Sequence, residues 1–267
     1  MSVSVNQIRF IDGAGYERFM GQWSQLVGDI FLDWLAPPGS QRWLDVGCGN
    51  GAFTERLVAR CAPAALTGID PSEEQLAYAR LRPALQAAAF CRGDAMALPF
   101  ADNAFDAAVM PLVIFFVPEP ARGVAEMARV VGPSGLVAAY AWDMVGGGFP
   151  YREWREELQS LGAAIPMHPS AEAPQMEALL DLWRDAGLSG LEAREITVER
   201  TFDDFDDYWA TLLLGPSVSD RLATLQPAAI AGLRERLKQR LPPDSSGRIT
   251  RSARAIAIKG VVPALPA

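Results

Sequence analysis

The sequence predicts an α/β fold, a doubly wound and mostly parallel sheet with helices on both faces. Two observations carry this prediction. Short apolar runs alternate with helix-like segments from residue 42 onward, which is the pattern of β-α-β units. One of the runs, 105–110 (FDAAVM), is apolar almost throughout. It therefore predicts a strand buried on both faces, as in a parallel sheet that helices cover on each side.

Seven segments have the composition of strands: 42–46, 65–69, 87–91, 105–110, 136–141, 191–200 and 253–259. Three helices are predicted between the first five of them, at 52–61, 72–81 and 119–131, because each of these segments opens near a turn or capping residue. After Tyr140 the alternation fades. Three consecutive glycines at 146–148 then predict a hinge, and the segments that follow predict a helical cap.

The length of 267 residues and the 50% hydrophobic content predict one domain with a substantial core. Within it we expect an N-terminal helical lid over 1–40, a ligand-binding core over 41–142, and helical cap insertions over 149–187 and 202–249. The second insertion contains an aromatic set that predicts either a buried helix face or the interface of a homodimer. This set is Phe202, Phe205, Tyr208 and Trp209.

Composition argues against several classes of partner. Lys and Arg number 24 against 32 Asp and Glu, and the resulting charge of −8 disfavours nucleic acid. The longest apolar stretch, 105–118, is too short to cross a bilayer, and the N-terminus lacks the pattern of a secretory signal. Both features predict a soluble, cytoplasmic protein. The 3 cysteines and the single histidine stand at no metal-ligand spacing, so we expect no metal site.

The most informative segment is 43–53, WLDVGCGNGAF, in which an apolar strand is followed by Gly47, Gly49 and Gly51 and then by a helix. Glycine permits positive φ and keeps a Cβ away from a ligand, while the amides at a helix N-terminus can bind a negative group. The same loop also satisfies the dinucleotide-binding pattern G-x-G-x-x-G/A. A nicotinamide-dependent (NAD or NADP) oxidoreductase is therefore an open alternative at this point.

Two acidic residues follow the next two predicted strands. Asp70 ends the second strand, where its carboxylate can accept hydrogen bonds from the two hydroxyls of a ribose, as any adenosine-containing cofactor requires. Asp94 lies in the turn after the third strand, before Ala95 and Met96, and a carboxylate there can accept from the exocyclic amine of adenine. The dinucleotide pattern accounts for Asp70 and leaves Asp94 unexplained.

The later segments ALPFADNAFDAAVM and PARGVAEMARVVGPSGL extend the pattern. In their order and spacing these motifs resemble class I S-adenosylmethionine (SAM)-dependent methyltransferases, in particular the small-molecule subgroup that includes the ubiquinone and menaquinone biosynthesis methyltransferases. The resemblance covers 43–140, and YERFMGQWS at 16–24 is similar to the N-terminal helix of the same group. It implies a Rossmann-like fold, SAM as cofactor, S-adenosylhomocysteine as product and a small-molecule acceptor.

The resemblance also implies which residues bind the cofactor. The glycine loop surrounds the methionine and ribose of SAM, Asp70 takes the ribose hydroxyls and Asp94 the adenine amine. The full implied set is Tyr16, Met20, Trp23, Asp45, Gly47, Cys48, Gly49, Asn50, Gly51, Asp70, Pro71, Asp94, Ala95, Met96, Met110, Pro111 and Leu112.

The N-terminal motif departs from the family at Gln22, where many relatives have a basic residue. Arg18, one turn away, is the alternative partner for the methionine carboxylate of SAM. Phe19 and Trp23 lie four residues apart, so they can equally well pack this helix on the sheet.

Methyl transfer from a sulfonium is an in-line displacement that mainly requires the acceptor to be positioned, so a dedicated base is optional. If the acceptor is a phenol or an acidic carbon, the candidate bases are Asp143 and His168, with Glu153 as a third. Aromatic residues near the expected mouth predict a hydrophobic or aromatic acceptor pocket: Phe115, Phe116, Trp142, Phe149, Tyr151 and Trp154. The sequence thus predicts methylation of oxygen or carbon in a small metabolite. Besides the oxidoreductase, the alternative is a protein that binds SAM without turnover.

Overall fold

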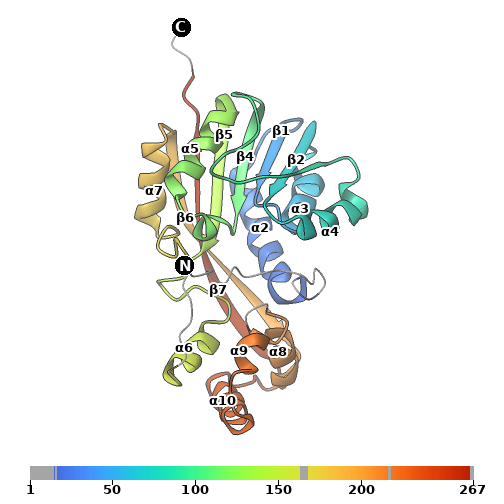
Figure 1. Cartoon of the computed structure of the whole chain (residues 1–267), viewed down its shortest axis with the longest axis vertical. Helices are drawn as coiled ribbons and strands as arrows, with labels where there is room; N and C mark the ends of the chain where they lie inside the picture. The colour runs from blue at the N-terminus through green and yellow to red at the C-terminus, as the bar shows by residue number, and fades with distance from the viewer. Residues whose placement is uncertain (1–14, 16, 163–167, 216–217, 265–267) are drawn as a thin grey trace, which may run out of the picture. The chain divides into compact units, whose positions relative to one another are not determined.

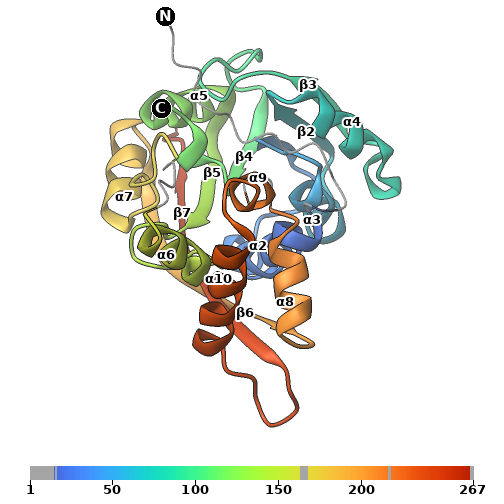
Figure 2. The same ribbon diagram turned by 60° about the horizontal axis from the view of Figure 1, so that its bottom comes forward.

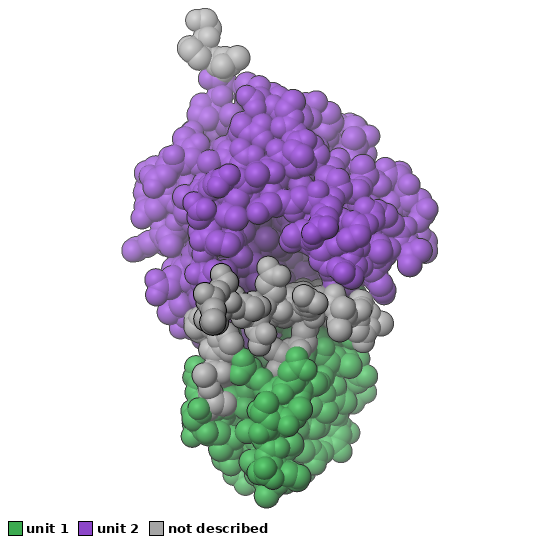
Figure 3. Space-filling view, viewed as in Figure 1, with its two compact units in different colours: residues 1–22, 151–165, 200–251 green, residues 23–150, 166–199, 252–267 purple. Residues whose placement is uncertain are grey.

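A computed structural model describes residues 15, 17–162, 168–215 and 218–264. The chain divides into two compact units, which Figure 3 shows in separate colours. The larger, here called the sheet unit, comprises residues 23–150, 166–199 and 252–267. The smaller, here called the helical unit, comprises residues 1–22, 151–165 and 200–251.

Seven strands of the described residues form one sheet, in the order β3-β2-β1-β4-β5-β7-β6 (Figure 1). Strands β1 to β5 pair in parallel, and β7 pairs antiparallel with β5. The predicted doubly wound, mostly parallel, seven-stranded sheet is therefore confirmed. The strand bounds are β1 Arg42–Val46, β2 Ala65–Asp70, β3 Ala89–Arg92, β4 Phe105–Pro111, β5 Val131–Trp142, β6 Ser189–Phe202 and β7 Ile249–Val261.

Several helices begin where the sequence supplies a cap or a proline. Ser72 accepts a hydrogen bond from the Gln75 amide and caps α4, while Pro120 occupies the first position of α5. The helix bounds are α2 Gln22–Leu35, α3 Ala52–Cys61, α4 Glu73–Leu81, α5 Pro120–Val130, α6 Arg152–Ser160, α7 Met176–Asp185, α8 Phe205–Leu212, α9 Val218–Leu222 and α10 Pro227–Arg240, with shorter turns at η1 Glu17–Gly21, η2 Pro83–Leu85 and η3 Ile114–Phe116. None of the helices built from described residues is long and apolar enough to span a bilayer.

The core of the sheet unit lies on both faces of the central strands. Residues 107–110 of β4 are fully buried, as the apolar run predicts. On β5, Tyr140 contacts the rings of Phe31 and Phe53, at centroid distances of 4.8 and 5.8 Å, so α2 and α3 pack against the same side chain. Figure 2 shows α4 beside β3 and α7 beside the β5–β7 part of the sheet.

Helix α7 belongs to the sheet unit, whereas α6 belongs to the helical unit. The reason is local contact: α7 packs on α5, and the indole nitrogen of Trp183 donates a 3.0 Å hydrogen bond to the Val137 carbonyl of β5. The segment 149–187, for which one cap insertion is expected, is therefore shared between two units.

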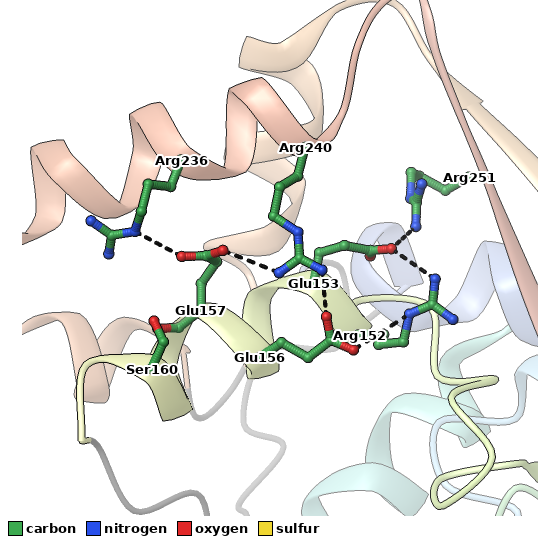
Figure 4. A network of polar contacts seen from close by, with 8 residues as sticks. All are labelled: Arg152, Glu153, Glu156, Glu157, Ser160, Arg236, Arg240 and Arg251. Carbon is green, nitrogen blue, oxygen red and sulfur yellow. Dashed lines mark hydrogen bonds and ion pairs between the residues drawn. The ribbon is translucent and has the colours of Figure 1, made fainter.

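The helical unit has its own core and its own ion pairs. Leu158 of α6 is buried with Leu233 and Leu237 of α10. The Glu157 carboxylate accepts from Arg236 Nε at 2.7 Å and from Arg240 at 3.1 Å, and these two guanidinium groups lower the pKa of Glu157 (Figure 4). Ion pairs therefore join α6 to α10 alongside the apolar contact.

The aromatic set of the second insertion is mostly covered within the helical unit. Phe202, Phe205 and Tyr208 are buried, and the Tyr208 ring lies 5.2 and 6.1 Å from the other two. The buried helix face is thus the arrangement that these residues adopt, and a homodimer stays a prediction.

Candidate active site

The glycine loop joins β1 to α3 at the carboxyl edge of the parallel strands. The amides of Gly47 and Cys48 both donate to the Ile69 carbonyl of β2, at 2.7 and 3.1 Å, and Gly51 N donates to Cys48 O at 2.9 Å. All three loop glycines have positive φ: 73° at Gly47, 52° at Gly49 and 83° at Gly51. The loop therefore has a fixed shape that other residues adopt only with strain.

The three glycines differ in what surrounds them. A Cβ on Gly47 would lie 2.4 Å from Val113, and one on Gly51 would lie 2.6 Å from Leu85. Neighbouring side chains therefore occupy the space beside both glycines. Around Gly49 the nearest atom to such a Cβ is 4.0 Å away. Gly49 thus presents bare backbone to open space, and a ligand can approach it closely.

Asp45 is a fully buried acid directly before this loop. Its Oδ2 accepts a 2.7 Å hydrogen bond from Thr54 Oγ1, whereas Oδ1 has no partner among the described residues. Burial raises the pKa of Asp45 to about 7. Asn50 Nδ2 is likewise buried with no partner in the part of the chain that the structure describes. One acceptor and one donor beside the loop are therefore available to a bound polar group.

Asp70, at the end of β2, is tied to the same loop. Its Oδ2 accepts from Gly49 N and its Oδ1 from Ser72 N, both at 2.9 Å. Burial raises the pKa of this carboxyl group, and the two backbone hydrogen bonds oppose that rise. A carboxylate has about four acceptor sites, so each oxygen can accept a second hydrogen bond, as the two hydroxyls of a ribose require.

Asp94 follows β3 in a tight turn. Its Oδ1 accepts from Met96 N at 2.8 Å, and Ala97 N donates to its backbone oxygen at 3.0 Å. Because β1, β2, β3 and β4 are parallel, the segments that follow them meet at one edge of the sheet. The predicted cofactor residues 45–51, 70–71, 94–96 and 110–112 all lie at the carboxyl ends of these four strands.

The segment after β4 contains a feature that the sequence does not signal. Leu112 has a φ of +59°, an uncommon value for a residue with a side chain, and its amide donates to the Tyr140 carbonyl at 2.7 Å. The next residue, Val113, fills the space beside Gly47. Strained backbone of this kind persists where its surroundings fix it. Here the hydrogen bond to Tyr140 and the contact of Val113 with Gly47 fix the segment after β4 against the glycine loop.

The predicted N-terminal contacts divide between the two units. Tyr16 lies outside the described residues. Met20 is buried in the helical unit, while Trp23 is fully buried in the sheet unit with its ring edge-on to Trp142 at 6.5 Å. Phe19 stacks on Tyr151 at 4.6 Å. Phe19 and Trp23 thus make packing contacts of the kind that the alternative predicts, and contact of Met20 and Trp23 with the cofactor stays a prediction.

Arg18, the alternative partner for the methionine carboxylate, forms a 2.7 Å ion pair with Asp207 inside the helical unit. A second arginine supports the glycine loop: Arg82 Nε donates to Asn50 O at 2.6 Å, and Arg82 also pairs with Glu55. Its position after α4 gives no sequence signal for this role.

The two candidate bases lie in different surroundings within the sheet unit. Asp143 Oδ1 accepts from Gly146 N at 2.7 Å, and Oδ2 is paired with Arg254. His168 lies against η3, with its ring 4.8 Å from Phe115 and 4.4 Å from Phe116. It also lines an open cavity of about 640 Å³ together with Pro120, Val145, residues 169–173, Ala178, Asp181, Leu182 and Asp185. The structure thus brings His168 to the segment that follows β4.

Comparison with known proteins shows which family the chain resembles. Residues 44–139 match the methyltransferase domain family. The chain is 29% identical over 193 residues to the ubiquinone/menaquinone biosynthesis C-methyltransferase UbiE of Roseobacter denitrificans, which covers 65% of this chain and 76% of that protein. It is 28% identical over 160 residues to the phthiotriol/phenolphthiotriol dimycocerosates methyltransferase of Mycobacterium tuberculosis, with 59% of this chain and 55% of that protein covered.

Solved structures show the same fold. The YcgJ protein of Bacillus subtilis superposes with a TM-score of 0.56 at 17% identity, covering 90% of this chain and 99% of that one. Phosphoethanolamine N-methyltransferase 2 of Haemonchus contortus, solved with SAM, superposes with a TM-score of 0.59 at 19% identity, covering 97% of this chain and 61% of that one. Residues 44–139 therefore form a methyltransferase domain, and the chain resembles the class I SAM-dependent methyltransferases, among them the UbiE C-methyltransferases.

Proposed function

We propose that this methyltransferase transfers the methyl group of SAM to oxygen or carbon of a small, hydrophobic or aromatic metabolite. The observation that carries the proposal is the open space at Gly49, whose amide is held by Asp70. Gly49 has no side chain, so its backbone leaves room for the ribose of a nucleoside cofactor. The neighbouring Asp70 carboxylate has acceptor sites left for the ribose hydroxyls.

Each acid has a separate part in this binding model. Asp70 accepts from the ribose hydroxyls, and Asp94 accepts from the adenine amine. Asp45 and Asn50 supply the buried acceptor and donor that the described residues leave without partners. The bound cofactor supplies an activated methyl group on a sulfonium, so the chain has to bind and orient the acceptor and exclude water.

For an acceptor that must lose a proton, we assign the general base to His168 rather than to Asp143. The Asp143 carboxylate is engaged by Gly146 and Arg254 and anchors the turn after β5. His168 lies beside Phe115 and Phe116, on the segment that leaves the carboxyl end of β4. The name C-methyltransferase carried by the UbiE relatives favours carbon as the accepting atom.

Calorimetric titration of the purified protein with SAM, S-adenosylhomocysteine, NAD and NADP tests the proposal. Micromolar binding of the first two alone is the expected result. Binding of NAD or NADP instead would favour the oxidoreductase. Binding of SAM without methyl transfer to any member of a panel of phenols, quinols and carboxylic acids would favour the protein that binds SAM without turnover.

Replacing His168 with glutamine is expected to lower kcat for the best acceptor of that panel by about 100-fold or more, because a positioned general base contributes about 10²–10⁴-fold. The rise of kcat with pH that deprotonation of the general base causes should disappear in this variant, and its affinity for SAM should stay unchanged. Asp143→Asn is the comparison variant. It should lower the melting temperature by loosening the turn and leave the profile in place, and the reverse pattern would assign the base to Asp143.

SAM affinity is expected to rise with pH between 6 and 7 and to level off above that range. Burial raises the pKa of Asp45 to about 7. Below pH 7 the folded protein without cofactor therefore holds a proton on Asp45. The stabilisation that this bound proton gives the cofactor-free protein is lost as the pH rises through 7. The positive charges of SAM favour the ionised form, so binding releases a proton and affinity gains up to about tenfold per pH unit. Calorimetry in two buffers of different ionisation enthalpy measures the proton. Asp45→Asn should release none, and a flat wild-type profile would contradict the linkage.

A further inference from the structure

The peptide group between Asn50 and Gly51 closes the glycine loop, and both of its polar atoms are hydrogen-bonded. Gly51 N donates to Cys48 O at 2.9 Å. Asn50 O accepts a 2.6 Å hydrogen bond from Arg82 Nε. Because the guanidinium is ionised, this hydrogen bond is stronger than one between two neutral groups. Arg82 therefore holds the end of the loop in one orientation, where the chain enters α3 with a φ of 83° at Gly51.

The Arg82 side chain is itself fixed by its neighbours, and only 12% of it is exposed. Its Nη1 donates to Glu55 Oε2 of α3 at 2.6 Å, and its guanidinium lies 5.4 Å from the centre of the Tyr78 ring of α4. A Cβ on Gly51 would lie 3.3 Å from Arg82 Cδ, so the aliphatic part of Arg82 packs against the loop. Arg82 thus connects the loop to both α3 and α4.

The residue that Arg82 holds carries a buried donor. Asn50 is 2% exposed, and its Oδ1 accepts from Ala52 N at 3.2 Å, whereas its Nδ2 has no partner among the described residues. Buried polar groups of native proteins are almost always paired, so this donor indicates a bound acceptor group. Since the rotamer of a side chain depends on the φ and ψ of its residue, fixing the Asn50 carbonyl also fixes the direction of Nδ2.

Two charged side chains of the sheet unit hold the loop, and they differ in what they leave for a ligand. Asp70 accepts from Gly49 N at 2.9 Å and retains acceptor sites for the cofactor. Arg82 donates to protein groups through Nε and Nη1, and Glu55 balances its charge. Arg82 therefore influences the cofactor through the shape of the loop, whereas Asp70 offers a contact of its own.

We propose that Arg82 is a positioning residue for SAM, which keeps Asn50 Nδ2 directed at an oxygen of the cofactor. A loop that is already fixed in its binding conformation loses less conformational entropy when the ligand binds, so Arg82 raises the affinity for SAM. Because Arg82 acts through the Asn50 side chain, the contributions of the two residues to SAM binding are coupled. The inference rests on the proposed function, in which SAM binds at the glycine loop.

A double-mutant cycle on the full-length protein tests this coupling, with calorimetric titration of SAM as the measurement. Arg82→Met keeps an unbranched apolar side chain without the donors, and it is expected to weaken SAM binding about tenfold. Asn50→Ser removes the Nδ2 donor, while the serine hydroxyl can still accept from the Ala52 amide. In the Asn50→Ser background, Arg82→Met should weaken binding by less than about twofold.

NMR provides a second measurement, which a loss of stability alone would not change. In ¹H–¹⁵N spectra of the wild type, S-adenosylhomocysteine is expected to shift the side-chain amide signals of Asn50, because Nδ2 gains an acceptor. In Arg82→Met this shift should be lost or reduced at saturating ligand, since Nδ2 is no longer directed at the cofactor. An unchanged shift in Arg82→Met would contradict the positioning role.

Arg80→Met is the matched control. Arg80 lies on α4, pairs with Glu73 and donates to the Phe90 carbonyl of β3 at 3.2 Å, so this variant loses the same kinds of contact away from the glycine loop. It should bind SAM as the wild type does. Equal SAM affinity of Arg82→Met and Arg80→Met would overturn the proposal.

The same loss of affinity from Arg82→Met in the wild-type and Asn50→Ser backgrounds would also overturn the proposal, because the two residues would then act independently. If circular dichroism shows that Arg82→Met is unfolded, Glu55→Gln takes its place in the cycle. That variant loosens the guanidinium by removing the charge of its partner, and it should weaken SAM binding only when Asn50 is present. Failure of SAM to bind the wild type is a separate result, which would overturn the proposed function instead.

Discussion

Replacing Gly49 with alanine is expected to weaken SAM binding by more than 100-fold while the sheet unit stays folded. Among the described residues, the added methyl group meets no atom closer than 4.0 Å, so it occupies only the open space into which the cofactor is proposed to fit. The φ of +52° adds a conformational cost of about 1–2 kcal/mol, which lowers the melting temperature without abolishing the fold. Alanine is preferable to valine here, because a β-branched residue would add strain that has nothing to do with the ligand.

Gly187→Ala is the matched control for this experiment. Gly187 also has a positive φ, 77°, and a Cβ built on it would meet nothing within 4 Å, so the substitution carries a similar conformational cost at the end of α7. Calorimetry gives the affinity of each variant, and circular dichroism gives its melting temperature. If Gly49→Ala binds SAM as tightly as Gly187→Ala does, the open space at Gly49 is not where the cofactor lies.

Short-range sequence patterns are enough to predict much of the ligand-binding core, residues 41–142. The strand over 42–46 and the helix over 52–61 coincide with β1 and α3, because an apolar run, a glycine turn and a helix-forming segment follow one another without interruption. The helix predicted from Ser72 begins one residue later, since Ser72 is its cap. The position of Asp70 is equally local, as it directly ends β2.

Features that depend on contacts between residues far apart in the chain could not be predicted from the sequence. Strand β5 begins at Val131 rather than 136, because Val131 pairs with Phe105 across residues that look like a turn. Asp143 is bound by Arg254, which lies 111 residues further along the chain. No local pattern indicates either partner, and the same holds for the positive φ of Leu112. The division of the cap into two units likewise depends on tertiary packing.

Replacing Asp70 with alanine is expected to weaken SAM binding by about 1–3 kcal/mol, or roughly 5- to 150-fold, the cost of losing charge-assisted hydrogen bonds to the ribose hydroxyls. Calorimetry with SAM measures the loss. The variant also deprives Gly49 N and Ser72 N of their acceptor, so part of the effect passes through the loop. Asp70→Asn separates the two contributions, because its amide oxygen can still accept from one of these backbone groups while the charge is gone.

Asp106→Ala is the control for a general effect of losing an aspartate from the sheet unit. Asp106 lies near the start of β4 and pairs with Arg42 at 2.7 Å at the first residue of β1, so it belongs to the amino end of these parallel strands. Exposed ion pairs of this kind contribute little, and SAM affinity should not change. The ribose assignment requires Asp70→Ala to lose more affinity than Asp70→Asn, and Asp70→Asn to lose more than Asp106→Ala. Equal SAM affinity in all three variants would show that Asp70 does not bind the cofactor. The buried acid Asp45 would then be the principal polar residue proposed to contact SAM.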